Sequence, residues 1–186
     1  MALLNIADAI YLGDRSVDRV YVGAQRVWPP WSGMVYVGPQ LSTQRGSTSG
    51  RRPIVTKIVL PTDGEIVEFV AERSSTSQEF KIILYADDGG VPGELVYVSD
   101  ALAGAFTSLP VSIPATAGSY WLGVVTGINT TQFTALVVEP GMELAYGDIG
   151  SWPSWVNPNP TEWVGGVNQP TAPERTPYVG LWYAPA

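Results

Sequence analysis

Cysteine and histidine are both absent from this chain of 186 residues. Without cysteine there is no disulfide framework, no thiolate zinc ligand and no cysteine nucleophile. Without histidine the chain lacks the commonest general base and metal ligand, and a Ser-His-Asp triad within one chain is excluded. The reactive groups that remain are carboxylates, hydroxyls, two lysines and eight arginines. We therefore expect no metal-dependent or nucleophilic catalysis, no catalytic residues and no cofactor.

Charge is scarce and unevenly distributed. Charged residues make up 15% of the chain, and the formal net charge is −7. Residues 1–57 carry seven basic and three acidic residues, a net +4, whereas residues 58–186 carry three basic and fourteen acidic residues, a net −11. The acidic balance argues against nucleic-acid binding, which needs clustered lysine and arginine to neutralise phosphates. The split indicates two surfaces with different partners, although ordinary solvated charge explains it equally well.

Long hydrophobic runs are missing as well. No apolar stretch approaches the roughly 18 residues of a membrane-spanning helix, and the first residues lack the basic start and apolar run of a secretory signal. We expect no membrane insertion, and a chain that stays in the cytoplasm unless an assembly or lysis carries it out.

Glycine, proline and large aromatic residues are abundant in contrast, with 20 Gly, 16 Pro, 7 Trp and 9 Tyr. Many turns together with many β-branched and aromatic residues favour short strands over helices. From residue 54 onward such strand patterns follow one another closely, at residues 55–60, 65–72, 80–86, 95–99, 106–113, 120–126, 133–138 and 178–183. The pattern predicts an all-β fold, with a jelly-roll-like antiparallel β-sandwich over residues 54–186.

A short repeat precedes this region. The Ile-Tyr-Leu-Gly that begins at Ile10 returns ten residues later as Val-Tyr-Val-Gly, and a degenerate third copy begins at Val35. Each copy is typical of a strand, a glycine turn and a second strand. We predict a small N-terminal β-hairpin element over residues 1–38, and the polar residues 39–53 are expected to form a linker.

An isolated hairpin is marginally stable in water, so this element is expected to dock on a partner subunit or on the sandwich. We predict a homo-oligomer, with a trimer favoured and residues 1–38 at a subunit contact. The arginines of the repeat suit ion pairs with an acidic partner surface, but a solvated strand face accounts for them equally. The predicted oligomer or anchor contacts are Tyr11, Arg15, Arg19, Tyr21, Arg26 and Trp28.

The proline-rich stretch 146–177 shows little periodicity and is too long for an ordinary connection, so it is predicted to be an ordered, functional loop. Three tryptophans lie in it, and a flat indole face stacks well on a sugar ring. The alternative is that these tryptophans cover the end of the sandwich or pack on a neighbouring subunit. Trp121 and Trp182 lie within predicted strands and are expected in the core. The predicted ligand-binding residues are Trp152, Trp155, Asn157, Asn159, Glu162 and Trp163.

The acidic run at residues 87–93, Asp-Asp-Gly-Gly-Val-Pro-Gly, admits two interpretations. A calcium loop needs six to eight oxygen ligands, and two adjacent aspartates supply few of them. A turn between strands is favoured, with a second turn at Pro92-Gly93. No metal site is predicted.

Two of these patterns carry a family resemblance. The repeat that ends in Val27-Trp28-Pro29 resembles the N-terminal segment of many minor tail proteins of bacteriophages, especially phages of actinobacteria. The following region resembles β-sandwich modules of the same proteins through the run from Leu84 to Leu95 and through Ala117-Gly118-Ser119-Tyr120-Trp121-Leu122-Gly123. These runs cover about a third of the chain.

The resemblance implies a virion structural protein, a minor tail protein anchored through its N-terminus and assembled in the host cytoplasm. Its implied partners are other phage tail proteins, and the outward sandwich would serve either binding to host cell-surface glycan or architecture. Two further functions stay open. One is a tail-associated glycan hydrolase that uses paired carboxylates, and the other is a capsid decoration protein.

Overall fold

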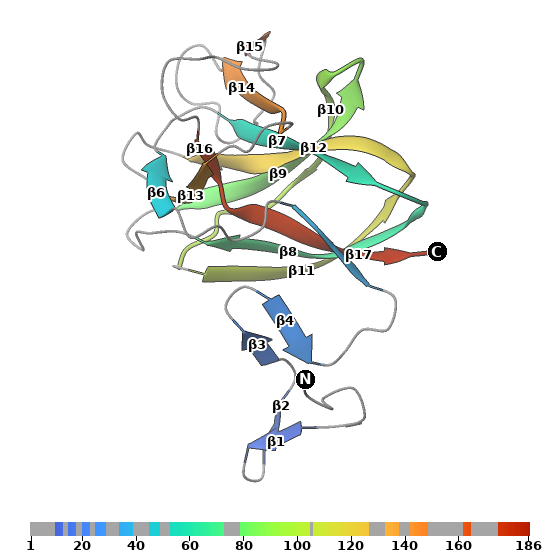
Figure 1. The fold of residues 1–186 in the computed structure, drawn as a ribbon, viewed down its shortest axis with the longest axis vertical. Coiled ribbons are helices and arrows are strands. Elements are labelled where there is room, and N and C mark those ends of the chain that lie inside the picture. Colours follow the sequence, from blue (N-terminus) through green and yellow to red (C-terminus); the bar gives the residue numbers. More distant parts are fainter. Residues whose placement is uncertain are drawn as a thin grey trace. The chain divides into compact units, whose positions relative to one another are not determined.

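The computed structural model describes the backbone of residues 10–12, 15–17, 20–22, 25–28, 34–38, 45–48, 53–72, 79–104, 106–126, 133–137, 142–148, 162–164 and 175–186 (Figure 1). The chain divides into two units, Met1–Met34 and Val35–Ala186. All regular elements in these ranges are strands, so the predicted all-β class is confirmed. The ranges contain no helix of the length and apolarity that crossing a membrane requires.

The first unit contains two antiparallel hairpins, one from each copy of the repeat. Tyr11 pairs with Ser16 in the first hairpin, and Tyr21 pairs with Arg26 in the second. The predicted N-terminal hairpin element is thus confirmed at the level of its strands. The strands are β1 (Ile10–Leu12), β2 (Arg15–Val17), β3 (Val20–Val22) and β4 (Gln25–Trp28).

The second unit is built on two antiparallel sheets. A six-stranded sheet has the order β10-β9-β12-β7-β14-β15, and a four-stranded sheet has the order β11-β8-β17-β5. The strands of the first sheet are β10 (Val91–Val98), β9 (Phe80–Asp88), β12 (Gly118–Thr126), β7 (Ile54–Leu60), β14 (Leu144–Asp148) and β15 (Glu162–Val164). The strands of the second are β11 (Phe106–Ala115), β8 (Gly64–Glu72), β17 (Val179–Pro185) and β5 (Val35–Val37).

The core lies between these two sheets. Alternate residues of β7, β9 and β12 in one sheet and of β8 and β17 in the other form a single buried apolar cluster. Phe69 on β8 stacks on Tyr97 of β10, with ring centroids 5.1 Å apart. Because one contiguous cluster takes side chains from both sheets, the two sheets pack face to face, and the predicted β-sandwich is confirmed.

The pairing of eight strands is nested. The first, β5, pairs with the last, β17; inside them β7 pairs with β12, β8 with β11, and β9 with β10. Such nesting is what a long hairpin rolled into two sheets produces, and it supports the jelly-roll order, which stays a prediction.

Antiparallel pairing sorts the connections to two ends of the sandwich. At one end, the turns β7–β8 (61–63), β9–β10 (89–90) and β11–β12 (116–117) are two or three residues long. We call this the tight-turn end. The connections β5–β7, β8–β9, β10–β11 and β12–β17 lie at the opposite end, and they include residues 38–53 and 127–178. We call this the long-connection end.

Several boundaries differ from the predictions. Residues 35–37 belong to the sandwich and not to the N-terminal element, because β5 pairs with β17. The predicted linker contains β6 (Arg45–Thr48), which pairs with β13 (Phe133–Val137), and β13 also pairs with β16 (Arg175–Pro177). The sequence of this polar stretch has no apolar alternation, so it did not predict a strand. The strand forms through pairing with residues about 85 positions further along the chain. The three-stranded sheet β16-β13-β6 therefore joins two of the long connections.

The predicted loop 146–177 is also more structured than expected, because it contains part of β14 and all of β15 and β16. In the run 87–93, the turn is limited to Gly89 and Gly90, whose φ angles of +64° and +96° suit glycine. The expected second turn at Pro92-Gly93 is wrong. These two residues lie inside β10, where the register shifts between Pro92 and Leu95 form a bulge.

The contact between the sheets predicts a stability difference. Phe69→Ala should lower the free energy of unfolding by about 3–5 kcal/mol, because it empties a buried aromatic site between the sheets. Val59→Ala on β7, where the side chain is 60% exposed, should change it by less than about 0.5 kcal/mol. Urea denaturation of both variants checks this, and equal effects would contradict the sandwich core.

Candidate functional site

The predicted ligand-binding residues fall largely outside the part of the chain that the structure describes. Trp152, Trp155, Asn157 and Asn159 lie outside it entirely. Glu162 and Trp163 lie on β15, the edge of the six-stranded sheet, where they pair with Asp148 and Gly147. Only their backbone is described, so the predicted site stays a prediction. In the chain, all six residues belong to the segment between β12 and β17.

The predicted anchor residues are placed by their strands alone. Tyr11 lies on β1, Arg15 on β2, Tyr21 on β3, and both Arg26 and Trp28 on β4. Arg19 and all six side chains fall outside the described residues. The contact of this element with a subunit therefore stays a prediction.

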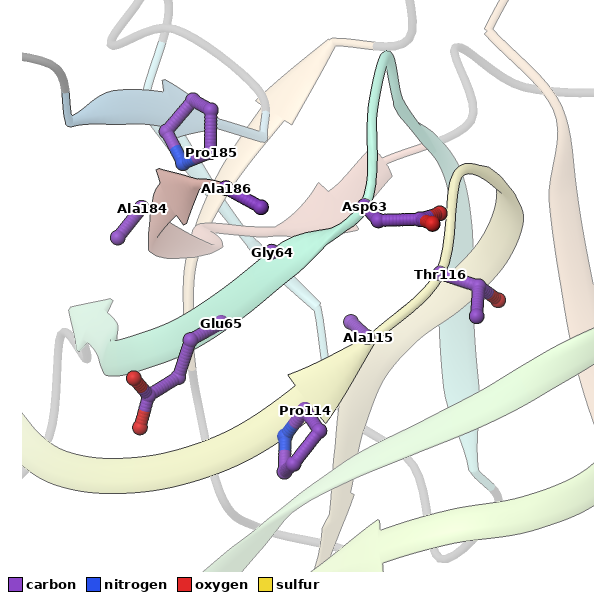
Figure 2. A pocket seen from close by; sticks show the side chains of 9 residues that line it. All are labelled: Asp63, Gly64, Glu65, Pro114, Ala115, Thr116, Ala184, Pro185 and Ala186. Carbon is purple, nitrogen blue, oxygen red and sulfur yellow. The ribbon is translucent and has the colours of Figure 1, made fainter.

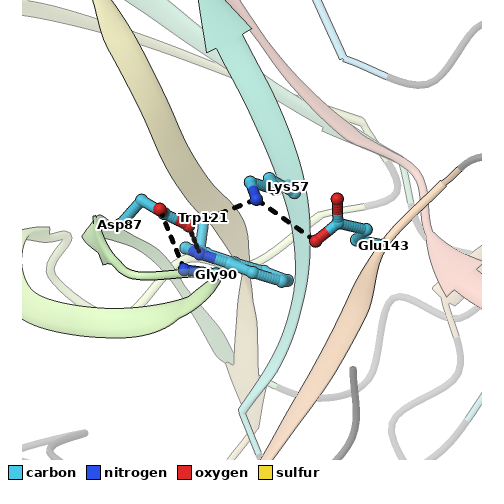
Figure 3. Close-up of polar contacts among 5 residues, drawn as sticks. All are labelled: Lys57, Asp87, Gly90, Trp121 and Glu143. Atoms are coloured by element: carbon cyan, nitrogen blue, oxygen red, sulfur yellow. Dashed lines mark hydrogen bonds and ion pairs between the residues drawn. The ribbon is translucent and has the colours of Figure 1, made fainter. Parts of the chain in front are cut away.

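A polar arrangement (Figure 3) lies on the outer face of the six-stranded sheet, because its residues alternate along β7, β9 and β12 with those of the core cluster. Trp121 on β12 lies between Lys57 on β7 and Tyr85 on β9 in the strand register. The backbone N–H of Lys57 donates to the carbonyl of Glu143 over 2.9 Å, which brings Glu143 next to Lys57. Neighbouring strands thus bring together four residues that are far apart in the sequence.

Asp87, at the end of β9, accepts three contacts. Trp121 Nε1 donates to Oδ1 over 2.7 Å, the Gly90 N–H donates to Oδ2 over 3.1 Å, and Lys57 Nζ lies 3.5 Å from Oδ1. Partial burial opposes ionisation, but the bonds from Trp121 and Gly90 and the charge of Lys57 outweigh it, so the pKa of Asp87 is lowered. The carboxylate form is therefore held in place, and it links the β9–β10 turn to β12.

Lys57 is shared between two carboxylates. Its Nζ lies 3.2 Å from Glu143 Oε2 and 5.6 Å from the centroid of the Trp121 ring. Partial burial would lower the pKa of Lys57, but the hydrogen bond to Glu143 and the charge of Asp87 exceed this effect, and the net shift is upward. The ammonium form persists, and it links Glu143, the residue before β14, to Asp87 on β9.

Beneath these charges lies a second apolar cluster. It contains Val55, Ile83, Tyr85, Trp121, Val125 and Ala145, all fully buried. Because Trp121 has no exposed surface, its ring cannot stack on a ligand. The row of Glu143, Lys57, Trp121 and Asp87 is therefore a structural clasp over this cluster, and we name these four residues the clasp.

The expectations for the strand tryptophans have different outcomes. Trp121 is buried as expected, although in the second cluster and not between the sheets. Trp182 is only half-buried and lies edge-on to Tyr36, with ring centroids 5.5 Å apart. The run 87–93 contains a turn between two strands, as favoured, but Asp87 itself lies at the end of β9, and its carboxylate accepts from the N–H of Gly90 in that turn. Within the described ranges, no group of three or more acidic residues is placed to hold a metal ion.

Sequence reasoning found the two motifs of the clasp but missed two of its members. Tyr85, Asp87 and Trp121 lie in the two runs that carry the family resemblance. Lys57 and Glu143 stand alone in the sequence, and only the pairing of β7 with both β12 and β14 brings them to Asp87. The sequence offered one indication of this site, which is that Lys57 is the only charged residue in the apolar run Ile54–Leu60.

Comparison with protein families, with curated proteins and with solved structures gives no significant match to this chain.

The clasp predicts a pH-dependent contribution to stability. Because the pKa of Asp87 is lowered in the folded state, its contribution is present above the unfolded value of about 3.9 and is lost as the pH falls through the folded value. Asp87→Asn should cost about 1–2 kcal/mol at pH 7, and the gap to wild type should narrow as the pH falls from 5 to 2. Urea denaturation across this range measures it.

Asp88→Asn is the matched control, since Asp88 is exposed at the end of the same strand. The prediction is contradicted if the loss of unfolding free energy in Asp87→Asn stays constant with pH, or if Asp88→Asn shows the same loss. Either result would show that the ionised carboxylate does not stabilise the clasp.

Proposed function

We propose that this chain is a non-enzymatic structural protein of a bacteriophage tail, a minor tail protein whose N-terminal repeat anchors it and whose sandwich faces outward. The observation that carries the proposal is the contact between Asp87 and Trp121. Asp87 and Trp121, one from each of the two runs that resemble tail-protein modules, are 34 residues apart in the chain, yet they lie on neighbouring strands and their side chains form a hydrogen bond. The two halves of the resemblance thus belong to one structural unit, which is what a shared module requires.

The chemistry of the clasp supports a non-enzymatic role. A general acid in glycan hydrolysis needs a carboxyl group whose pKa is raised toward the working pH. Asp87 has the opposite shift, because Trp121, Gly90 and Lys57 stabilise its carboxylate. The absence of histidine and cysteine points the same way.

The long-connection end is the surface that we assign to host contact. A rigid sandwich commonly presents its binding residues on the loops at its ends. The longest connections gather at this end, and the sheet β16-β13-β6 ties two of them together. The same connections contain three of the seven tryptophans, and aromatic anchors carry much of the energy of binding. We propose that they contact host cell-surface glycan.

Substitutions in this connection separate binding from architecture. If the tryptophans bind glycan, Trp155→Ala and Trp163→Ala should weaken adsorption to host cells, or to purified cell-wall polysaccharide, with little change in the thermal midpoint. If they are structural, each should cost about 3–5 kcal/mol of stability. Val59→Ala at the outer face of β7 serves as the control. A melting shift with no specific adsorption defect would contradict the glycan proposal, and release of reducing sugar would contradict the non-enzymatic one.

The N-terminal repeat predicts self-association. Short hairpins cannot bury enough apolar surface alone, so we expect the full-length chain to form an oligomer, with a trimer favoured. Light scattering on the full chain, compared with a chain that begins at Val35, measures this. The shorter chain should be monomeric. A monomeric full-length chain, or an oligomer that survives removal of the repeat, would contradict the prediction.

A further inference from the structure

The chain contains two Asp-Gly pairs, and both lie at the tight-turn end. They are Asp63-Gly64, where β8 begins, and Asp88-Gly89, between β9 and β10. Both aspartates are exposed, so neither the dipeptide nor its exposure distinguishes them. An aspartate before glycine is prone to react with its own backbone, because glycine has no side chain to block the approach of its nitrogen to the aspartate side chain.

This reaction requires only water. The backbone nitrogen of the glycine attacks Cγ of the protonated carboxyl group, an N–Cγ bond forms, and the hydroxyl leaves as water with the amide proton. Water then adds to one of the two carbonyls of the resulting cyclic imide and breaks one C–N bond. Opening at Cγ restores aspartate, whereas opening at the main-chain carbonyl leaves the chain running through Cγ, which is isoaspartate.

The first pair is fixed by its surroundings. Asp63 Oδ1 accepts from the backbone N–H of Ala117 over 2.7 Å, and the carbonyl of Asp63 accepts from the Tyr183 hydroxyl over 2.8 Å. Gly64 begins β8 between β11 and β17 (Figure 2). A Cβ at Gly64 would overlap the carbonyl oxygen of Ala184. Ring closure at Asp63 therefore has to break hydrogen bonds and move a paired strand.

The second pair has more freedom. Only Gly89 and Gly90 connect Asp88 with its partner Val91, and their φ angles are +64° and +96°. The side-chain bond within this turn comes from Asp87, and none of the described residues bonds to the carboxylate of Asp88. Beyond its chain neighbours, a Cβ at Gly89 would meet no atom within 4 Å. An exposed turn of two glycines opens locally at little cost in free energy.

We propose that Asp88 is a site of spontaneous isomerisation to isoaspartate and that the fold protects Asp63 from the same reaction. The two dipeptides are identical, so the difference comes from the hydrogen bonds and the packing around them. The proposal does not depend on the tail function, on glycan binding or on the N-terminal repeat.

Isomerisation at Asp88 would loosen the clasp. Isoaspartate adds its Cβ to the main chain, which lengthens a turn of two residues. The pairing of Asp88 with Val91 and the bond from the Gly90 N–H to Asp87 both depend on the length of this turn. Asp87 also accepts from Trp121. We therefore expect the modified chain to be less stable than the unmodified chain.

Oxygen exchange tests the site directly. Each passage through the imide exchanges a carboxyl oxygen with solvent, so the folded full chain is incubated in H₂¹⁸O at neutral pH and then digested in ordinary water. Cleavage by chymotrypsin after Tyr85 and Tyr97, and by trypsin after Lys57 and Arg73, separates the two pairs. Tandem mass spectrometry then locates the label. Label at Asp88 should exceed label at the other aspartate about tenfold or more, because closure there must first break two hydrogen bonds.

The unfolded chain is the control for the effect of the fold. In guanidinium chloride both pairs should take up label at comparable rates, because the bonds that hold Asp63 are lost. Equal labelling of the two aspartates in the folded chain, or faster labelling of Asp63, would overturn the proposal. A folded chain that leaves Asp88 unlabelled over a time in which the unfolded chain labels it would also overturn it, since the turn would then be protective.

Asp88→Glu is the matched variant, because it keeps the charge but must close a larger ring, which forms far more slowly. Residues 86–97 of this variant should gain neither label nor isoaspartate. During long incubation the thermal midpoint of the wild type should fall as isoaspartate accumulates, while that of Asp88→Glu stays constant. Label in the variant at the wild-type level would assign the reaction to Asp87 and overturn the site. An unchanged midpoint in fully modified wild type would overturn the effect on the clasp.

Discussion

The apolar layer between the two sheets is the constraint on which the rest of the sandwich depends. Each strand has one face that must leave water, and a sheet can bury that face only against another layer. Residues such as Phe69 on β8 and Tyr97 on β10 meet across this layer. Once the layer has formed, the antiparallel pairing of the strands fixes which connections lie at each end of the sandwich.

The outer face of the six-stranded sheet has a buried apolar cluster of its own. Its apolar residues, including Val55, Ile83 and Tyr85, have no described opposing sheet of the sandwich, yet they are fully buried. The clasp lies at this cluster with one ammonium between two carboxylates, and the indole of Trp121 is both part of the cluster and a hydrogen-bond donor to Asp87. Aromatic residues with a polar atom suit such a boundary, because one part is apolar and the other finds a polar partner.

The two ends of the sandwich differ in the length of their connections. The turns at the tight-turn end are too short to vary, and side-chain bonds such as that of Asp63 to Ala117 fix them further. The long-connection end has room for extra strands, and β6, β13 and β16 use it.

The sequence by itself determined the strands whose patterns are local. Alternating or apolar runs predicted β7, β8, β9, β11 and β12 near their observed bounds, because the faces of each strand are visible in its own residues. The glycine pair at 89–90 predicted its turn for the same reason. Tertiary structure alone decided the rest. Strand β6 has no apolar alternation and is a strand through its pairing with β13. Lys57 and Glu143 acquired a role only when β7 paired with β12 and β14. Pairing between residues far apart in the chain leaves no periodic signal, so no local pattern could place those residues beside Asp87.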